Sequence, residues 1–125
     1  MAVKSDAGAA TAGSVEGDGV LVVLTTAADG EAADVMAKSL VEERLAGCVS
    51  RTPVGSTYRW EGSVVSEPEV LMVIKTTAGR WPELERRIRE LHTYQTPEIV
   101  ALGAEEVESH YLSWLIDAVA DEEPN

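Results

Sequence analysis

Residues 56–77 read STYRWEGSVVSEPEVLMVIKTT, and this stretch decides the fold. In its first part Tyr58 and Trp60 alternate with polar residues, which is typical of a strand with two different faces. The run VLMVI at 70–74 is apolar at every position, so its side chains point to both sides of a sheet and both sides require burial. The stretch therefore predicts a long β-hairpin with a tight polar turn, whose second strand needs cover on both faces.

Two elements are expected before the hairpin. The apolar run VLVVL at 20–24 predicts a strand that is buried on both faces. Asp29 is a suitable N-cap for a helix from about Gly30 to Ala46, and Gly47 is expected to supply its left-handed C-terminal cap. From Cys48 onward the chain is expected to be extended, and Pro53 favours a bulge or an exposed edge strand.

Three elements are expected after the hairpin. Apolar residues at helical spacing predict a one-sided helix, with Pro82 allowed in its first turn: Trp81, Leu84, Ile88 and Leu91. A further strand is expected at 98–103. The last element is a helix at 111–119, for which Ser109 is a possible N-cap.

This order of elements predicts a fold of the α+β class, a ferredoxin-like (split βαβ) sandwich with a long β-hairpin and a C-terminal helix. Both crossover helices would lie on one face of the sheet. The other face would carry apolar residues of VLVVL, VLMVI and IVAL. Leaving about six such side chains in water would forfeit roughly 10 kcal/mol, which is comparable to the whole stability of a domain. A closed homo-oligomer is therefore expected.

The 22 acidic and 10 basic residues among the 125 give a formal net charge of −12. This charge disfavours nucleic acid and anionic membranes as partners, because both require a basic surface. Arginines at 86, 87 and 89 interleave with glutamates, which is typical of a solvated helix face. Charge alone favours a generally acidic surface over a cation-collecting function.

Composition also indicates the compartment and the domain limits. One cysteine, Cys48, excludes an internal disulfide and favours a reducing compartment, and no stretch is apolar enough for a signal peptide or a membrane helix. The cytoplasm is the expected location. Residues 1–18 are small and polar and predict a disordered tail, 19–120 predict one domain, and 121–125 predict a flexible acidic end.

The segment HTYQTPEIV at 92–100 concentrates the unusual chemistry. Imidazole from His92 and carboxylate from Glu98 suit copper(II), zinc or nickel, and Tyr94 adds a hydroxyl. Two ligands from one chain form an open site, so completion across a subunit interface is required. The alternative is structural: His92 caps the preceding helix, and Glu98 pairs with an arginine.

Other reactive side chains have simpler interpretations. Cys48 follows the expected helix cap, where a lone cysteine is most often a small core residue rather than a reactive thiol. His110 lies beside the start of the last helix and is expected at the surface. The chain contains no Gly-rich phosphate loop and no nucleophile with an evident base, which predicts a non-enzymatic protein.

Several of these motifs resemble, in order and spacing, the CutA divalent-cation tolerance family: TTAADGEAA, LVEERLAGCV, STYRWEG, EVLMVIKTT, HTYQTPEI and YLSWL. The resemblance spans about residues 20–118 and implies a ferredoxin-like subunit in a compact homotrimer, like the PII signalling proteins. It also implies copper or other divalent-cation binding at His92 and Glu98. A cysteine proposed as a further ligand in some members is Thr25 here, and this chain departs from the family elsewhere at Ala28, Gly47, Ser50 and Thr93.

Two functions follow as hypotheses. The first is a non-enzymatic homotrimer that binds divalent cations, Cu2+ first, through His92, Glu98 and a third group from a neighbouring subunit. The second is a PII-like signalling or scaffold trimer that binds a small molecule or a protein in clefts between subunits, lined by Tyr58, Arg59, Trp60, Lys75 and Tyr94. In either case the trimer interface is expected to include Trp60, Leu71, Val73 and Trp114.

Overall fold

The computed structural model describes residues 17–121, so the expectations for the tail at 1–18 and the end at 121–125 fall almost entirely outside the described residues. The elements are β1 (Val20–Ala27), α1 (Gly30–Glu42), β2 (Cys48–Trp60), β3 (Ser63–Thr77), the 3-10 turn η1 (Ala78–Arg80), α2 (Trp81–Leu91), β4 (Val100–Gly103) and α3 (Ser109–Ala118).

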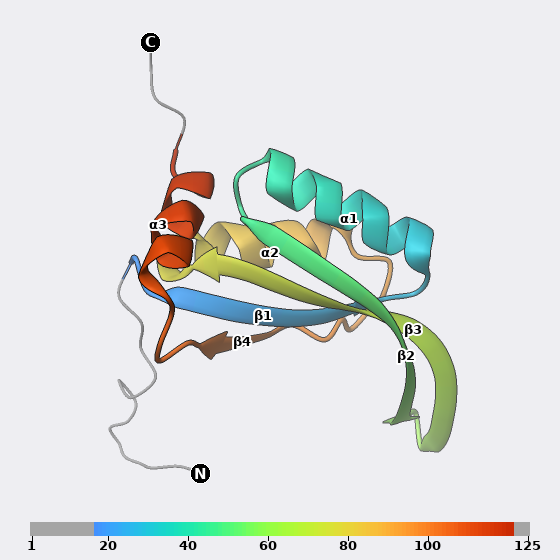
Figure 1. Cartoon of the computed structure of the whole chain (residues 1–125). Helices are drawn as coiled ribbons and strands as arrows, with labels where there is room; N and C mark the ends of the chain where they lie inside the picture. The colour runs from blue at the N-terminus through green and yellow to red at the C-terminus, as the bar shows by residue number, and fades with distance from the viewer. Residues whose placement is uncertain (1–16, 122–125) are drawn as a thin grey trace.

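The four strands form one sheet in the order β2-β3-β1-β4, and every neighbouring pair is antiparallel. β1 and β2 are therefore parallel with β3 between them, and β3 and β4 are parallel with β1 between them. Each crossover helix returns the chain to the same sheet, and α1 and α2 lie on one side of it (Figure 1). The predicted split βαβ arrangement is confirmed.

The hairpin between β2 and β3 is longer than the stretch that predicted it. Its turn consists of Glu61 and Gly62, whose φ angles of 49° and 85° match the two-residue turn that fits the twist of paired strands. The pairing is continuous from Cys48↔Lys75 to Trp60↔Ser63, so the bulge considered near Pro53 is absent, and the alternative of an edge strand is confirmed. The free end of the hairpin bends away from the body, opposite to α3 (Figure 1).

Helix α1 begins as predicted and ends early. The Ala32 amide donates to Asp29 Oδ1 at 2.8 Å, which confirms the N-cap. The helix ends at Glu42 rather than near Ala46, because Arg44 takes the left-handed conformation, with φ of 61°. The prediction that Gly47 caps the helix is therefore wrong.

Gly47 has a different role, in packing. A Cβ at this position would lie 2.4 Å from Leu115 Cδ1, closer than real Cβ atoms approach other atoms. Leu115 is fully buried, and it occupies the space that the missing side chain leaves. Glycine lets α3 pack directly on the backbone that leads into β2, and any side chain here would displace Leu115.

The later boundaries differ slightly from the expected ones. Helix α2 begins at Trp81 with Pro82 in its first turn, as predicted. β4 begins at Val100, two residues after the expected start. The N-cap of α3 is Glu108 and not Ser109, since the Tyr111 amide donates to Glu108 Oε1 at 2.9 Å.

A single hydrophobic core lies between the sheet and the two crossover helices. Its buried members come from β1, α1, β3, α2 and the segment after α1: Leu21, Val23, Ala27, Ala33, Met36, Ala37, Leu40, Leu45, Ala46, Met72, Ile74, Leu84 and Ile88. We call this side of the sheet the covered face. The residues that point to the covered face are the odd-numbered apolar residues of β1 and, on β3, Met72 and Ile74.

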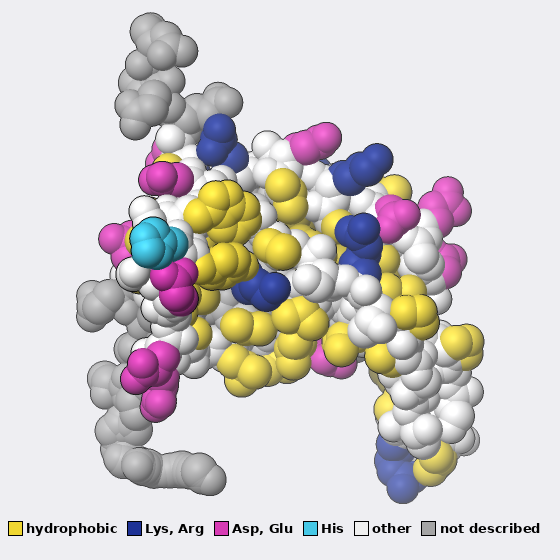
Figure 2. Space-filling view, viewed as in Figure 1, with side chains coloured by type: hydrophobic (Ala, Val, Ile, Leu, Met, Phe, Trp, Pro, Cys, Tyr) yellow, Lys and Arg dark blue, Asp and Glu magenta, His cyan; other side chains and the backbone are white. Residues whose placement is uncertain are grey.

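The opposite side, which we call the open face, carries the alternate residues of the same strands. Apart from Val20, which is buried at the start of β1, its apolar members are half-buried or exposed: Val22, Leu24, Leu71, Val73, Val100 and Leu102. Figure 2 shows apolar side chains gathered over the strands, with a basic side chain among them. VLMVI thus places Met72 and Ile74 in the core and Leu71 and Val73 on the open face, which the crossover helices do not cover. That the open face is covered by another copy of the chain stays a prediction.

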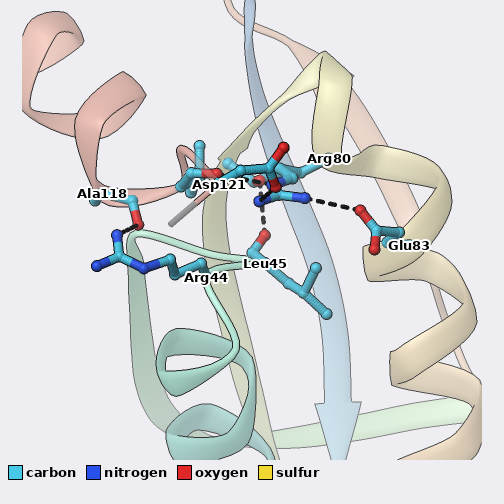
Figure 3. A network of polar contacts seen from close by, with 8 residues as sticks. Arg44, Leu45, Arg80, Glu83, Ala118 and Asp121 are labelled. Carbon is cyan, nitrogen blue, oxygen red and sulfur yellow. Dashed lines mark hydrogen bonds and ion pairs between the residues drawn. The ribbon is translucent and has the colours of Figure 1, made fainter. Parts of the chain in front are cut away.

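Two arginines hold the C-terminal end of α3 against the body (Figure 3). Arg80 donates from Nε to the Val119 carbonyl at 2.7 Å and pairs through its other nitrogens with Glu83 and Asp121. Arg44 Nη1 donates to the Ala118 carbonyl at 3.4 Å. Cations beside the last carbonyls of a helix are favourable, so these contacts fix α3 at one end of the sheet. Of the helices described, none is long and apolar enough to cross a membrane.

Candidate functional site

His92 lies at the end of α2, where it is the C-cap residue, and its ring contacts the end of β1. Nε2 lies 2.7 Å from the Thr26 carbonyl oxygen, and the Tyr94 amide donates to Nδ1 at 3.1 Å. A carbonyl can only accept and an amide can only donate, so Nε2 carries the proton and Nδ1 carries the lone pair. The ring is therefore held as one neutral tautomer.

Two tyrosines donate to two carboxylates of β3 close to His92. Tyr94 Oη donates to Glu69 Oε2 at 2.6 Å, and its ring lies 4.8 Å from the His92 ring between centroids. Tyr58 Oη donates to Glu67 Oε1 at 2.8 Å. Glu69 is 8% exposed, so the phenol satisfies a carboxylate that is almost out of water. The end of the sheet thus holds a cluster of acidic and phenolic groups.

The electrostatics of this cluster favour protonated phenols. Burial and the hydrogen bond to Glu69 raise the pKa of Tyr94 far above its ordinary value. The hydrogen bond to Glu67 raises the pKa of the exposed Tyr58 as well. Both tyrosines therefore act as hydrogen-bond donors across the physiological pH range.

A hollow of about 330 Å³ lies beside His92, between the first turn of α1 and the segment after α2. Its lining is largely apolar and includes Asp29 and Glu31; the other lining residues are Ala27, Ala32, Val35, Met36, Leu91, His92 and Thr93. No lysine or arginine lines it. Its volume is at the lower end of the range of small-molecule pockets.

The structure brings some predicted site residues together and separates others. Tyr58 and Tyr94 belong to the same cluster, and Thr25 Oγ1 lies 3.4 Å from His92 Nε2, so the family's cysteine position is beside the histidine. Glu98 is exposed in the segment before β4. Within residues 17–121, no group of three His, Cys, Asp or Glu side chains could hold a metal ion.

The remaining residues of the predicted cleft lie apart from this cluster. Arg59 and Trp60 are exposed at the free end of β2. Lys75 lies near the other end of β3, where its Nζ is 4.0 Å from Cys48 Sγ. Within one chain, the residues predicted for the ligand cleft therefore do not form one pocket.

Sequence reasoning missed Glu67 and Glu69. Their signal was visible as two carboxylates at i and i+2, directly before the apolar run at 70–74. Alternation places both on the same side of the strand as Leu71 and Val73. Their tyrosine partners come from β2 and from the segment after α2, and only the folded chain shows the second of these contacts.

Comparisons with known proteins identify relatives of this chain. A family model described as CutA1 divalent ion tolerance protein matches residues 21–118. The divalent-cation tolerance protein CutA of Thermus thermophilus is 50% identical over 95 residues, which cover 75% of this chain and 92% of that protein.

Solved structures give the same result for the fold. The Thermus thermophilus divalent cation tolerance protein (Cut A1) matches with a TM-score of 0.78 at 46% identity, over 81% of this chain and 99% of that chain. A protein described as the periplasmic divalent cation tolerance protein CutA of Archaeoglobus fulgidus matches with a TM-score of 0.79 at 32% identity, over 81% of this chain and 99% of that chain. The predicted α+β fold is confirmed.

Proposed function

This chain belongs to the CutA1 divalent ion tolerance family, and from that premise we propose that it binds Cu2+ or another divalent cation as a homotrimer. His92 and Glu98 supply ligands, and a neighbouring subunit supplies the third. The family is one of tolerance proteins, in agreement with the prediction of a non-enzymatic protein.

The tautomer of His92 is the observation that carries the cation proposal. Histidines that bind metals nearly always donate their second N–H to a carbonyl or a carboxylate, which fixes the ring and raises its basicity. His92 Nε2 makes such a contact with the Thr26 carbonyl. Nδ1 is the atom available to a cation, once the Tyr94 amide moves away from it.

The ligand count requires the assembly. The described part of one chain offers no three-residue site, and two ligands hold a divalent cation weakly. Glu98 lies exposed in the same irregular segment as Tyr94, and none of the ion pairs found within residues 17–121 includes it. The open face supports the trimer, because a second copy is the simplest cover for its apolar side chains. Trp60, Leu71, Val73 and Trp114 are proposed to lie in that interface.

Calorimetric titration of Cu2+ into tag-free protein tests the cation proposal. We expect saturable binding that His92→Ala abolishes and Glu98→Gln weakens, while the molecular mass of the assembly stays the same. His110→Ala is the matched control, because His110 is the other histidine, is exposed and also contacts a carboxylate, that of Glu108. Equal affinity in wild type and His92→Ala would contradict the proposal and indicate non-specific collection by the acidic surface.

A second candidate function is supported by the two tyrosine–carboxylate pairs, whose tyrosines both belong to the predicted ligand cleft. In this alternative a PII-like trimer binds a small molecule or a protein partner in clefts between subunits, lined by Tyr58, Arg59, Trp60, Lys75 and Tyr94. A screen of metabolites by thermal unfolding tests it, since a ligand of the native state raises the melting temperature. Tyr94→Phe is expected to reduce the shift, and a screen without any shift would argue against this function.

The cytoplasm is the proposed compartment, because the single cysteine fits a reducing environment. The Archaeoglobus fulgidus relative is described as periplasmic, so the periplasm is the alternative compartment. Cell fractionation with an antibody against the chain decides between the two compartments.

A further inference from the structure

Lys75 is a cation at one end of the apolar part of the open face. The strand register places it opposite Val22 and Cys48, and Leu102 lies in the same row on β4. Its Nζ has one polar contact in the described chain, a weak one of 4.0 Å to Cys48 Sγ, and none of the ion pairs found within residues 17–121 includes it. Covering this face therefore requires a counter-charge for Lys75, because an unpaired ammonium is costly to remove from water.

The same face is acidic at its other end. Glu69 and Glu67 share the side of β3 that carries Lys75 and lie six and eight residues before it, which is about 20 and 26 Å along a strand. Each accepts a hydrogen bond from a tyrosine, and neither has a cationic partner in the described chain. The open face thus has a basic end, an apolar middle and an acidic end.

We propose that Lys75 pairs with Glu67 of a neighbouring copy of this chain when the open faces are brought together. Placing the basic end of one face on the acidic end of the next covers the apolar middle and satisfies both charges. Glu67 is favoured over Glu69, because Glu69 is nearly buried behind Tyr94, whereas Tyr58, the partner of Glu67, is exposed.

This pairing rests on the assembly proposed above and adds its register. A contact between two different ends of one surface is heterologous, and a heterologous contact closes into a ring when the rotation allows it. The charge pattern would then disfavour arrangements that place two basic ends or two acidic ends together. The copies would be held in one register by a charged contact at the edge of an apolar interface.

Charge reversal tests the pairing. Sedimentation equilibrium over a dilution series of the full chain gives the concentration at which half of the chains are assembled. Lys75→Glu is expected to raise that concentration at least about tenfold, and the double variant Lys75→Glu/Glu67→Lys to return it to within about threefold of wild type. The two residues lie far beyond the screening length of about 8 Å within one chain, so recovery reports a contact between chains.

Controls separate the pairing from other effects. Glu42→Lys makes a matched charge reversal at the end of α1, on the helix side, and is expected to leave assembly unchanged. Circular dichroism checks that each variant folds. If Lys75→Glu does not fold, Lys75→Gln replaces it. Lys75→Gln is expected to raise the concentration of half-assembly by less than about tenfold and to make assembly less dependent on salt.

Three results would overturn the pairing while leaving the assembly in place: an assembled wild type that tolerates both Lys75 variants, a loss that Glu67→Lys does not reverse, or reversal by Glu69→Lys instead. A wild type that remains a single chain at every concentration would overturn the proposed assembly as well.

Discussion

The two faces of the sheet are built from alternate residues of the same strands, yet they differ in cover. On the covered face Val23, Met72 and Ile74 have no exposed surface, whereas Val100 and Leu102 on the open face retain 44% and 51% exposure. Both faces are apolar, so hydrophobicity alone does not distinguish them. The difference shows that the crossover helices cover one face within the chain, so changes to the covered face and to the open face are expected to affect stability and the proposed assembly separately.

The largest effect is expected for Met72→Ala on the covered face. The side chain is fully buried between the sheet and the helices, so its removal leaves a cavity and costs about 2–5 kcal/mol of the free energy of unfolding. Urea unfolding followed by circular dichroism measures the loss. A cost below that of a change on the open face would contradict the division into two faces.

The next largest effect is expected for Gly47→Ala, which tests how α3 covers its end of the sheet. The added Cβ would meet Leu115 Cδ1 at 2.4 Å, and overpacking of this kind costs about 1–3 kcal/mol. Chemical denaturation of the single variants and of Gly47→Ala/Leu115→Val measures the coupling, and the double variant should lose less than the sum of the two.

Gly55→Ala is the matched control for Gly47→Ala. A Cβ at Gly55 meets nothing within 4 Å, so its replacement should be close to neutral. Additive losses in the double variant would mean that the close approach of α3 is not what requires glycine at 47.

A smaller effect, about 1 kcal/mol, is expected for Tyr94→Phe at the acidic end of the open face, because Glu69 loses a hydrogen bond. The raised pKa of Tyr94 also predicts a pH dependence. The folded state holds the Tyr94 phenol proton more tightly than the unfolded state does. The resulting contribution to the free energy of unfolding is fully present below the unfolded pKa of about 10 and is lost as the pH rises from there through the folded pKa. Thermal unfolding between pH 8 and 11 should show a shallower decline in the variant, and Tyr111→Phe is the control.

The smallest effect on the single chain is expected for Val73→Thr, which adds a hydroxyl to the open face at almost constant volume. Val73 neighbours Met72 and is only half-buried, so unfolding of the dissociated chain should change by less than about 0.5 kcal/mol. Assembly should weaken, because an interface would bury the hydroxyl without a partner. Light scattering measures assembly, and an unchanged mass would argue against burial of Val73 between copies.

Most of the fold could be predicted from local patterns. The alternation around Tyr58, the apolar run at 70–74 and the cap at Asp29 indicated the hairpin and the first helix, because these features depend on residues close in sequence. The end of α1 could not be predicted in this way. Arg44 is left-handed at a position where the sequence favoured Gly47, and the glycine is used instead for a contact with α3, about 70 residues later.

The candidate site divides in the same manner. His92 and Tyr94 stood out in the sequence because they lie together in one unusual segment. Their partners, the Thr26 carbonyl and the Glu69 carboxylate, come from two different strands, and no spacing rule connects them. Lys75 was grouped with Tyr58 and Trp60 on sequence grounds, yet one chain places it at the opposite end of the face.

The sequence by itself determined the order of strands and helices and the apolar character of both faces of β3, because side-chain periodicity and local caps are properties of neighbouring residues. The resemblance to the family came from the order and spacing of its motifs. Only the tertiary structure decided which face is covered, which tautomer His92 holds and where the charges of the open face lie. These depend on contacts between distant segments, whose geometry is fixed only when the chain packs.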